Sequence, residues 1–248
     1  MTKRIQLSNY QFRIFLAILF IWIPLSFSSI AYGSSISALP IESKLYGLSY
    51  PDWVANYYRW IASIPEEENH PVLDKTGQSC STYQNDSKIF YLVDALSGNP
   101  VVRQCTVPKD TPVLVNLLYS MCDEKVDRED FQVQPVKCVE DGLADTHISF
   151  SIDGIPFDGK LQPDINKFKV EPIFFNVSYA NGNYLSTGGE YTPGKNYKSI
   201  IGAYMIILEP LPLGKHTVAF DVISGGCTEN DPSCSPYHGN VKYNLIVI

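Results

Sequence analysis

Alternating hydrophobic and polar residues near the C-terminal end of the chain predict two half-buried β-strands. In residues 215–223, one face of the strand carries His216, Val218, Phe220 and Val222. Since successive side chains of a strand point to opposite faces, this pattern is typical of a sheet with one solvated face. Residues 241–248 repeat the alternation, whereas residues 201–208 are apolar on both faces and predict a central strand. The Pro-Leu-Pro-Leu-Gly sequence at residues 210–214 supplies the turn after that strand.

Further strands are predicted over residues 88–94, 101–107, 113–119, 146–153 and 173–179. The first two flank the turn sequence Ser97-Gly98-Asn99-Pro100 and are expected to form a hairpin. Asp153-Gly154 is a second turn sequence. The sequence therefore predicts a mainly β fold, an antiparallel β-sandwich with one N-terminal amphipathic helix packed on it. No repeat or linker divides residues 34–248, which we expect to form a single domain.

The helix is predicted to begin at Ser49 and to stop before Pro65. Ser49 is a favourable capping residue, and Asp52 lies near the positive end of the helix dipole. The apolar stripe of this helix consists of Trp53, Tyr57, Trp60 and Ile64. Such spacing is typical of a helix face packed on a sheet. An aromatic platform for a sugar ring is the alternative interpretation of the same stripe.

Residues 1–33 have the order of features found in a secretory signal peptide. Basic residues precede the apolar run at residues 14–27, and Ala31-Tyr32-Gly33 offers small residues for cleavage. We therefore expect export, with a secreted or cell-surface location. The alternative is an uncleaved anchor, because the apolar segment approaches the roughly 20 residues of a spanning helix.

The charge of the exported part excludes one class of partner. Removing residues 1–33 removes three of the 19 basic residues and none of the 26 acidic ones, so the net charge moves from −7 to −10. A surface of this charge repels nucleic acid and anionic lipid. We expect no nucleic-acid partner and no membrane insertion after cleavage.

All six cysteines lie in the exported part of the chain. In an oxidising compartment an even set indicates disulfides, although the connectivity is open. Sequential pairing is predicted because each pair brackets one local unit: Cys80 with Cys105, Cys122 with Cys138, and Cys227 with Cys234. The spacing of the cysteines matches no common zinc site.

Acidic residues after the helix form a candidate catalytic cluster. Its members are Glu66, Glu67, Glu68, His70 and Asp74, with Asp52 as a further carboxylate. Such groups could act as general acid and base or hold a cation, but a solvated turn has the same composition. A second charged stretch at residues 123–130 invites a calcium hypothesis, yet it lacks the ligand spacing of a known calcium loop. We expect no metal ion and no cofactor.

The segment 180–199 is predicted to be a long loop rich in glycine, asparagine and tyrosine. Long loops in compact domains are often functional or mobile. Its aromatic residues Tyr184, Tyr191 and Tyr197 are the predicted contact surface. Two sequons, at Asn85 and Asn176, are compatible with glycosylation of an exported protein.

Several short motifs resemble a family of secreted bacterial and archaeal proteins without an assigned function. They are Trp60-Ile61-Ala62-Ser63-Ile64-Pro65, Asn69-His70-Pro71, Asp74-Lys75-Thr76-Gly77 with Cys80, Arg103-Gln104-Cys105-Thr106-Val107-Pro108, and the run from Pro210 to Val218. The resemblance covers most of the mature chain. It implies export and a shared fold, and it carries no catalytic residues.

Two functions remain open from the sequence. The first is a secreted or cell-surface module without enzymatic activity that binds an extracellular glycan or protein. The alternative is an extracellular carboxylate-dependent hydrolase, similar to a glycosidase, that uses the acidic cluster with His70. Two carboxylates about 5–10 Å apart in a cleft beneath exposed aromatic residues would favour the hydrolase.

Overall fold

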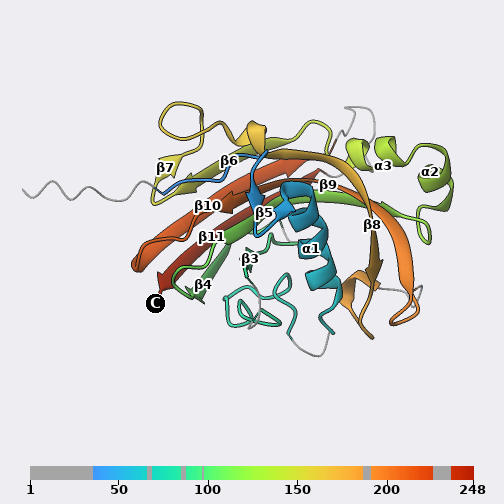
Figure 1. Cartoon of the computed structure of the whole chain (residues 1–248), viewed down its shortest axis with the longest axis horizontal. Coiled ribbons are helices and arrows are strands. Elements are labelled where there is room, and N and C mark those ends of the chain that lie inside the picture. Colours follow the sequence, from blue (N-terminus) through green and yellow to red (C-terminus); the bar gives the residue numbers. More distant parts are fainter. Residues whose placement is uncertain (1–35, 66–68, 85–87, 97, 187–190, 226–235) are drawn as a thin grey trace, which may run out of the picture. The chain divides into compact units, whose positions relative to one another are not determined.

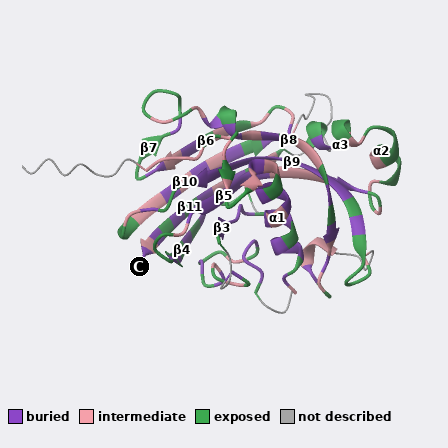
Figure 2. Ribbon diagram, in the orientation of Figure 1, coloured by how far each residue is buried: buried purple, intermediate pink, exposed green. Residues whose placement is uncertain are grey.

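The computed structural model describes residues 36–65, 69–84, 88–96, 98–186, 191–225 and 236–248. In this part of the chain, two β-sheets pack together and helix α1 (Tyr50–Ala62) lies on the smaller sheet (Figure 1). The fold is mainly β and sandwich-like, so the fold class predicted from the sequence is confirmed. Figure 2 shows the buried residues concentrated on the strands of both sheets and on α1.

The four-stranded sheet has the order β3–β5–β9–β8, with the bounds Phe90–Leu92 (β3), Val113–Asp123 (β5), Asn196–Leu208 (β9) and Lys169–Ser178 (β8). The five-stranded sheet has the order β4–β11–β10–β6–β7, with the bounds Val101–Val107 (β4), Tyr237–Val247 (β11), Gly214–Ser224 (β10), His147–Ile152 (β6) and Ile155–Pro156 (β7). A separate two-stranded ladder joins β1 (Lys44–Leu45) to β2 (Leu48–Ser49).

The strand patterns read from the sequence are confirmed for β9, β10 and β11. Strand β9 is central in its sheet and buried from Ile200 to Leu208 on both faces. On β10 and β11, buried and more exposed positions alternate as predicted. The turn between β6 and β7 has Asp153 and Gly154 at positive φ, as the sequence Asp-Gly predicts.

The predicted hairpin between residues 88–94 and 101–107 is wrong. Strand β3 pairs in parallel with β5 in one sheet, and β4 pairs in parallel with β11 in the other. The burial patterns give the physical reason, because every residue of β3 is buried whereas β4 alternates between buried and exposed. The two strands fit different environments, and the chain crosses between the sheets at this point.

Helix α1 begins as predicted. The Ser49 side chain accepts a hydrogen bond from the backbone of Asp52, and the Asp52 carboxylate accepts one from the backbone of Ser49 (2.9 Å). The aromatic stripe is buried: Trp60 is 8% exposed and stacks on Tyr91 with 4.9 Å between ring centroids. The stripe therefore packs the helix on the sheet, and its rings do not form an exposed platform for a sugar.

Two further helices follow β5, namely α2 (Arg128–Val133) and α3 (Pro135–Gly142). The Cys122–Cys138 disulfide joins α3 to β5. Gly202 on β9 allows close packing of α3, since a Cβ atom there would meet Val139 and Leu143. Short 3-10 turns, η2 (Ile165–Phe168) and η3 (Tyr184–Ser186), precede and follow β8.

Two of the three predicted disulfides, Cys80–Cys105 and Cys122–Cys138, are confirmed. They indicate an oxidising environment. Cys227 and Cys234 lie outside the described residues, as does the predicted signal peptide at residues 1–33. None of the helices in the described ranges combines the length and the apolar character needed to cross a membrane.

Candidate functional site

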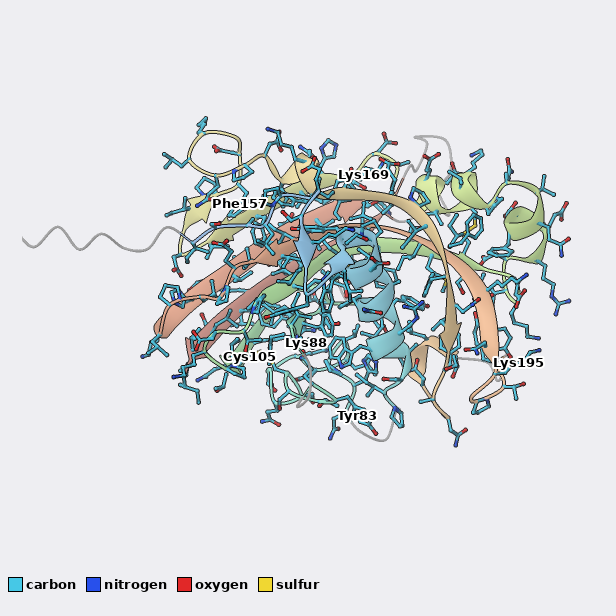
Figure 3. All side chains as sticks on the ribbon, viewed as in Figure 1. Tyr83, Lys88, Cys105, Phe157, Lys169 and Lys195 are labelled. Carbon is cyan, nitrogen blue, oxygen red and sulfur yellow. A yellow bond between two sulfur atoms is a disulfide. The ribbon has the colours of Figure 1, made fainter. Side chains whose placement is uncertain are left out.

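The loop of residues 69–80 carries two of the sequence motifs, and it contacts a third motif on strand β4. The Gln104 amide of β4 donates a hydrogen bond to the carbonyl oxygen of Thr76 (2.8 Å). Gly77 has φ +93° and lies against the Gln104 backbone, where a Cβ atom would collide with the carbonyl group. The disulfide between Cys80 in the loop and Cys105 on β4 links the same two segments; Cys105 is labelled in Figure 3. These motif residues hold the loop against the edge of the sheet.

His70, a candidate acid or base, is 1% exposed and bonded to the backbone at both ring nitrogens. Its Nε2 donates to the carbonyl oxygen of Ile61 (2.9 Å), and its Nδ1 accepts from the amide of Val72 (3.3 Å). Burial lowers the pKa of His70, against the smaller opposite effect of the bond to Ile61. The neutral ring therefore fastens the loop to the C-terminal end of α1.

Asp74, the second described member of the cluster, is also bonded to the backbone. Oδ1 accepts from the amide of Thr76 (2.7 Å), and Oδ2 accepts from the amide of Ser79 (2.8 Å). Burial raises the pKa of Asp74, but the hydrogen bonds from Ser79 and Thr76 outweigh it and hold the pKa below the usual value. The carboxylate stabilises the turn that presents Gly77 to β4.

A surface groove of about 730 Å³ lies beside this loop, lined by Asn69, His70, Leu73, Asp74, Gln78, Ser79 and Thr82. Of these lining residues, Asp74 alone carries a carboxylate. Glu66, Glu67 and Glu68 lie outside the described residues. Asp52 caps the opposite end of α1 from His70. The described residues therefore do not bring two of the predicted carboxylates together in this groove.

The three tyrosines predicted as a contact surface pack inward. Tyr184 packs edge-on against His70, with 4.3 Å between ring centroids. Tyr191 donates a hydrogen bond to the Asp123 carboxylate. Tyr197 is 3% exposed, and its hydroxyl accepts from the amide of Thr192 (2.8 Å). These contacts hold the three tyrosines in the fold and do not favour the predicted contact role. The predicted loop also ends earlier than expected, because strand β9 begins at Asn196.

Arg103, the first residue of one of the sequence motifs, lies in a buried polar cluster that the motif did not predict. Its side chain is 1% exposed, and it donates to the Tyr243 hydroxyl (2.7 Å). It also donates to four backbone carbonyls, those of Val72, Asp74, Val93 and Asp94. The alternation of β4 places Arg103 on the buried face with Val101, Cys105 and Val107, so its inward position was readable from the sequence.

Asp94 supplies the carboxyl group of the same cluster. It is 6% exposed, and the Tyr237 hydroxyl donates to its Oδ2 (3.4 Å). Burial raises the pKa of Asp94 to about 6, although the charge of Arg103 acts in the opposite direction. A carboxyl group of this pKa can exchange a proton near neutral pH, but its burial keeps it from a substrate at the surface.

An open groove lies on the solvated face of the five-stranded sheet. One part has a volume of about 510 Å³ and the adjoining part about 330 Å³, and both are lined by Ser149 and Asp221. The strand register puts Ser149, Asp221 and Asn240 in one row across the sheet. Ser151, Ala219 and Lys242 form the next row.

Small and polar side chains line this groove, which we call the outer groove. The short side chain of Ala219 lies between the longer groups of its row. In the neighbouring row, Asp221 Oδ2 accepts hydrogen bonds from Asn240 Nδ2 (2.6 Å) and His238 Nε2 (2.9 Å). From Ser151 to His147, the groove follows β6 for about 13 Å at the usual rise of a strand. The groove thus offers hydrogen-bond donors and acceptors along an open path.

One group of possible metal ligands occurs within the described ranges: Cys122, Asp127 and Cys138. The two sulfur atoms are joined in a disulfide, so they are not available as thiolate ligands. In the charged stretch nearby, Asp123 Oδ1 accepts from the amides of Lys125 (2.6 Å) and Val126 (2.8 Å). Its carboxylate therefore stabilises the turn after β5.

Of the two sequon asparagines, the structure describes Asn176 and not Asn85. Asn176 is exposed on β8, and its backbone oxygen accepts a hydrogen bond from Arg59 (2.9 Å). Asn85 lies outside the described residues. An exposed side chain makes Asn176 accessible for modification.

Comparison with known proteins leaves the function open. No family model matches the chain, and no curated protein is significantly similar to it. One solved structure, "Solution Structure of Amebosin", shares 12% identity and covers 62% of this chain and 95% of its own. Its TM-score of 0.18 is too low to support an argument about fold or function.

Proposed function

We propose that this chain is a secreted or cell-surface binding module without enzymatic activity, and that its ligand is an extracellular glycan. The observation that carries the proposal is the outer groove over β6, β10 and β11, with its two rows of small and polar side chains. Carboxylate, amide, hydroxyl and ammonium groups in such rows match the hydroxyl groups of a sugar chain. The disulfides and the N-terminal sequence support an extracellular location.

The described motif residues support a binding function over catalysis. His70 and Asp74 are each bonded to the backbone, which leaves them poorly placed to transfer protons. His216 is similar, since its Nδ1 lies 2.7 Å from Asp153 and its Nε2 lies 2.8 Å from the carbonyl oxygen of Pro212. These contacts give the family motifs a structural explanation that needs no reaction.

A glycan fits the outer groove better than a protein partner. Protein interfaces rely on buried aromatic or arginine anchors. The aromatic residues that line this groove, Phe150 and Phe220, are each 3% exposed and belong to the core. Among its lining residues the groove offers polar contacts and no exposed aromatic ring, so a glycan would bind through its hydroxyl groups and not by stacking of its sugar rings.

Filling the groove is expected to abolish glycan binding. Ala219→Trp should weaken binding at least about tenfold, because the indole would occupy the low centre of the groove. Asp221→Asn keeps the shape but removes the charge, and it should weaken binding about fivefold through weaker hydrogen bonds. A glycan array, followed by titration of the best ligand, measures both effects.

The control is Thr106→Trp, which adds the same indole to an exposed position of β4 in the same sheet. It should change the affinity less than about twofold. Equal binding by the wild type and Ala219→Trp would show that the ligand binds elsewhere. Failure of the wild type to bind any glycan would reject the proposal.

A further inference from the structure

In the part of the chain that the structure describes, three aromatic side chains are more than half exposed. They are Tyr46 (53%), Tyr83 (53%) and Phe174 (64%). Tyr83 and Phe174 each stand two residues before the asparagine of a sequon, Asn85 and Asn176. An exposed aromatic ring therefore recurs at the same distance in sequence from both sequons.

Strand β8 places Phe174 and Asn176 on the same face. Burial alternates along this part of the strand, with Phe175 and Val177 buried and the other two side chains exposed. Phe175 packs edge-on against Tyr58 of α1, with 5.6 Å between ring centroids, so the exposed side chains point away from this helix. At the usual rise of a strand, the Cα atoms of Phe174 and Asn176 are about 6.7 Å apart. A sugar ring bonded to Asn176 is therefore within reach of the Phe174 ring.

The Phe174 ring has little protein cover on this face. It contacts Phe131 of α2 edge-on, with 6.2 Å between ring centroids. Asn176 pairs across the ladder with Lys198 of β9, whose side chain is also exposed. Strand β8 is an edge strand of its sheet. An apolar ring at an uncovered sheet edge favours association between copies, and proteins usually mask such positions.

We propose that Asn176 carries an N-linked glycan and that the first sugar of this glycan packs on the Phe174 ring. The C–H groups on one face of a pyranose ring are apolar, so their contact with an aromatic face removes both surfaces from water. Ser178 completes the sequon that a glycosyl transferase recognises. The proposal shares only the extracellular location with the binding function and does not involve the outer groove.

The attachment is the transfer of a glycosyl group from a sugar phosphate donor during export. The side-chain nitrogen of Asn176 forms a bond to the anomeric carbon of the sugar, and the bond from that carbon to the phosphate oxygen breaks. The phosphate leaves with the electron pair of the broken bond, and the amide nitrogen loses one proton to a base of the transferase. The step involves no oxidation or reduction.

Glycopeptide mapping of the protein secreted by its native organism tests the modification. Tandem mass spectrometry of the peptide that contains Asn176 should show the added mass of a glycan. Ser178→Ala, expressed in the same organism, should remove this mass, whereas Ser178→Thr keeps the sequon and should retain it. Unmodified Asn176 in the wild type would overturn the proposal. A dimer of unmodified copies that Phe174→Ala dissociates would also overturn it, because a second copy would then cover the ring.

A double-mutant cycle in the same organism tests the contact between the sugar and the ring. Asn176→Gln removes the glycan, and urea unfolding measures the change in the folding equilibrium constant. We expect a decrease of about fivefold when Phe174 is present. The decrease should be less than about twofold in the Phe174→Ala background, because the sugar then has no ring to contact.

The matched control replaces Tyr46, an exposed ring without a neighbouring sequon. The Lys88 Nζ atom lies 5.7 Å from the centre of this ring, so Tyr46→Ala has a stability cost of its own, which cancels in the cycle. In the Tyr46→Ala background, Asn176→Gln should still lower the folding equilibrium constant about fivefold. Equal decreases in the wild-type and Phe174→Ala backgrounds would show that the glycan does not use the ring and would overturn the proposal.

Discussion

Arg103→Leu is expected to destabilise the protein by about 3–5 kcal/mol, the usual cost of breaking a buried charged network. The substitution removes the hydrogen bonds to Tyr243 and to four backbone carbonyls. Two of these carbonyls, of Val72 and Asp74, belong to the 69–80 loop. Leucine has no donor to replace those bonds, so the loop and the segment after β3 lose their shared anchor. Urea unfolding followed by circular dichroism measures the effect.

The control for this variant is Arg128→Leu, the same change on the exposed helix α2. Among the residues that the structure describes, the Arg128 side chain makes one hydrogen bond, from Nε to the carbonyl oxygen of Lys125 (3.1 Å). Its loss should cost less than about 1 kcal/mol. Similar losses in both variants would mean that Arg103 is not the anchor that its contacts indicate.

Asp94→Asn is expected to remove a pH dependence of stability worth about 3 kcal/mol, at 1.36 kcal/mol for each pKa unit. The folded pKa of about 6 lies above the usual aspartate pKa of 3.8, which applies to the unfolded chain. The folded state therefore binds this proton more tightly. The resulting stabilisation is fully present below pH 3.8 and is lost as the pH rises through about 6.

The difference between wild type and Asp94→Asn isolates this group, because all other titrating residues are shared. The free energy of unfolding, measured in urea from pH 3.5 to 8, should fall more with rising pH in the wild type than in the variant. Asp141→Asn, an exposed carboxylate on α3, is the matched control and should follow the wild type. Parallel curves for wild type and Asp94→Asn would show that Asp94 titrates normally.

Local patterns in the sequence predicted much of the fold. The alternation on β10, the capping residues Ser49 and Asp52, and the Cys80–Cys105 pair follow from short-range geometry, and the structure confirms each. The same local patterns did not predict which strands pair with each other. A turn sequence between β3 and β4 favoured a hairpin, but tertiary packing placed the strands in different sheets.

The site was harder to predict because it depends on contacts between distant segments. The sequence around Tyr191 and Tyr197 predicted a loop, yet Tyr191 bonds to Asp123, and Tyr197 lies in strand β9 with its hydroxyl bonded to Thr192. The outer groove combines side chains from β6, β10 and β11, and only the strand register aligns Ser149 with Asp221 and Asn240. No short motif encodes that alignment.

The most direct test of binding without hydrolysis is to incubate the wild-type protein with the polysaccharide that the glycan array selects. Measured over hours by release of reducing ends, the reaction should show no product above the background of Ala219→Trp. Release of reducing ends that Glu67→Gln abolishes, while Ala219→Trp retains it, would contradict the account. The hydrolase alternative, with its acidic cluster beside His70, would then replace it.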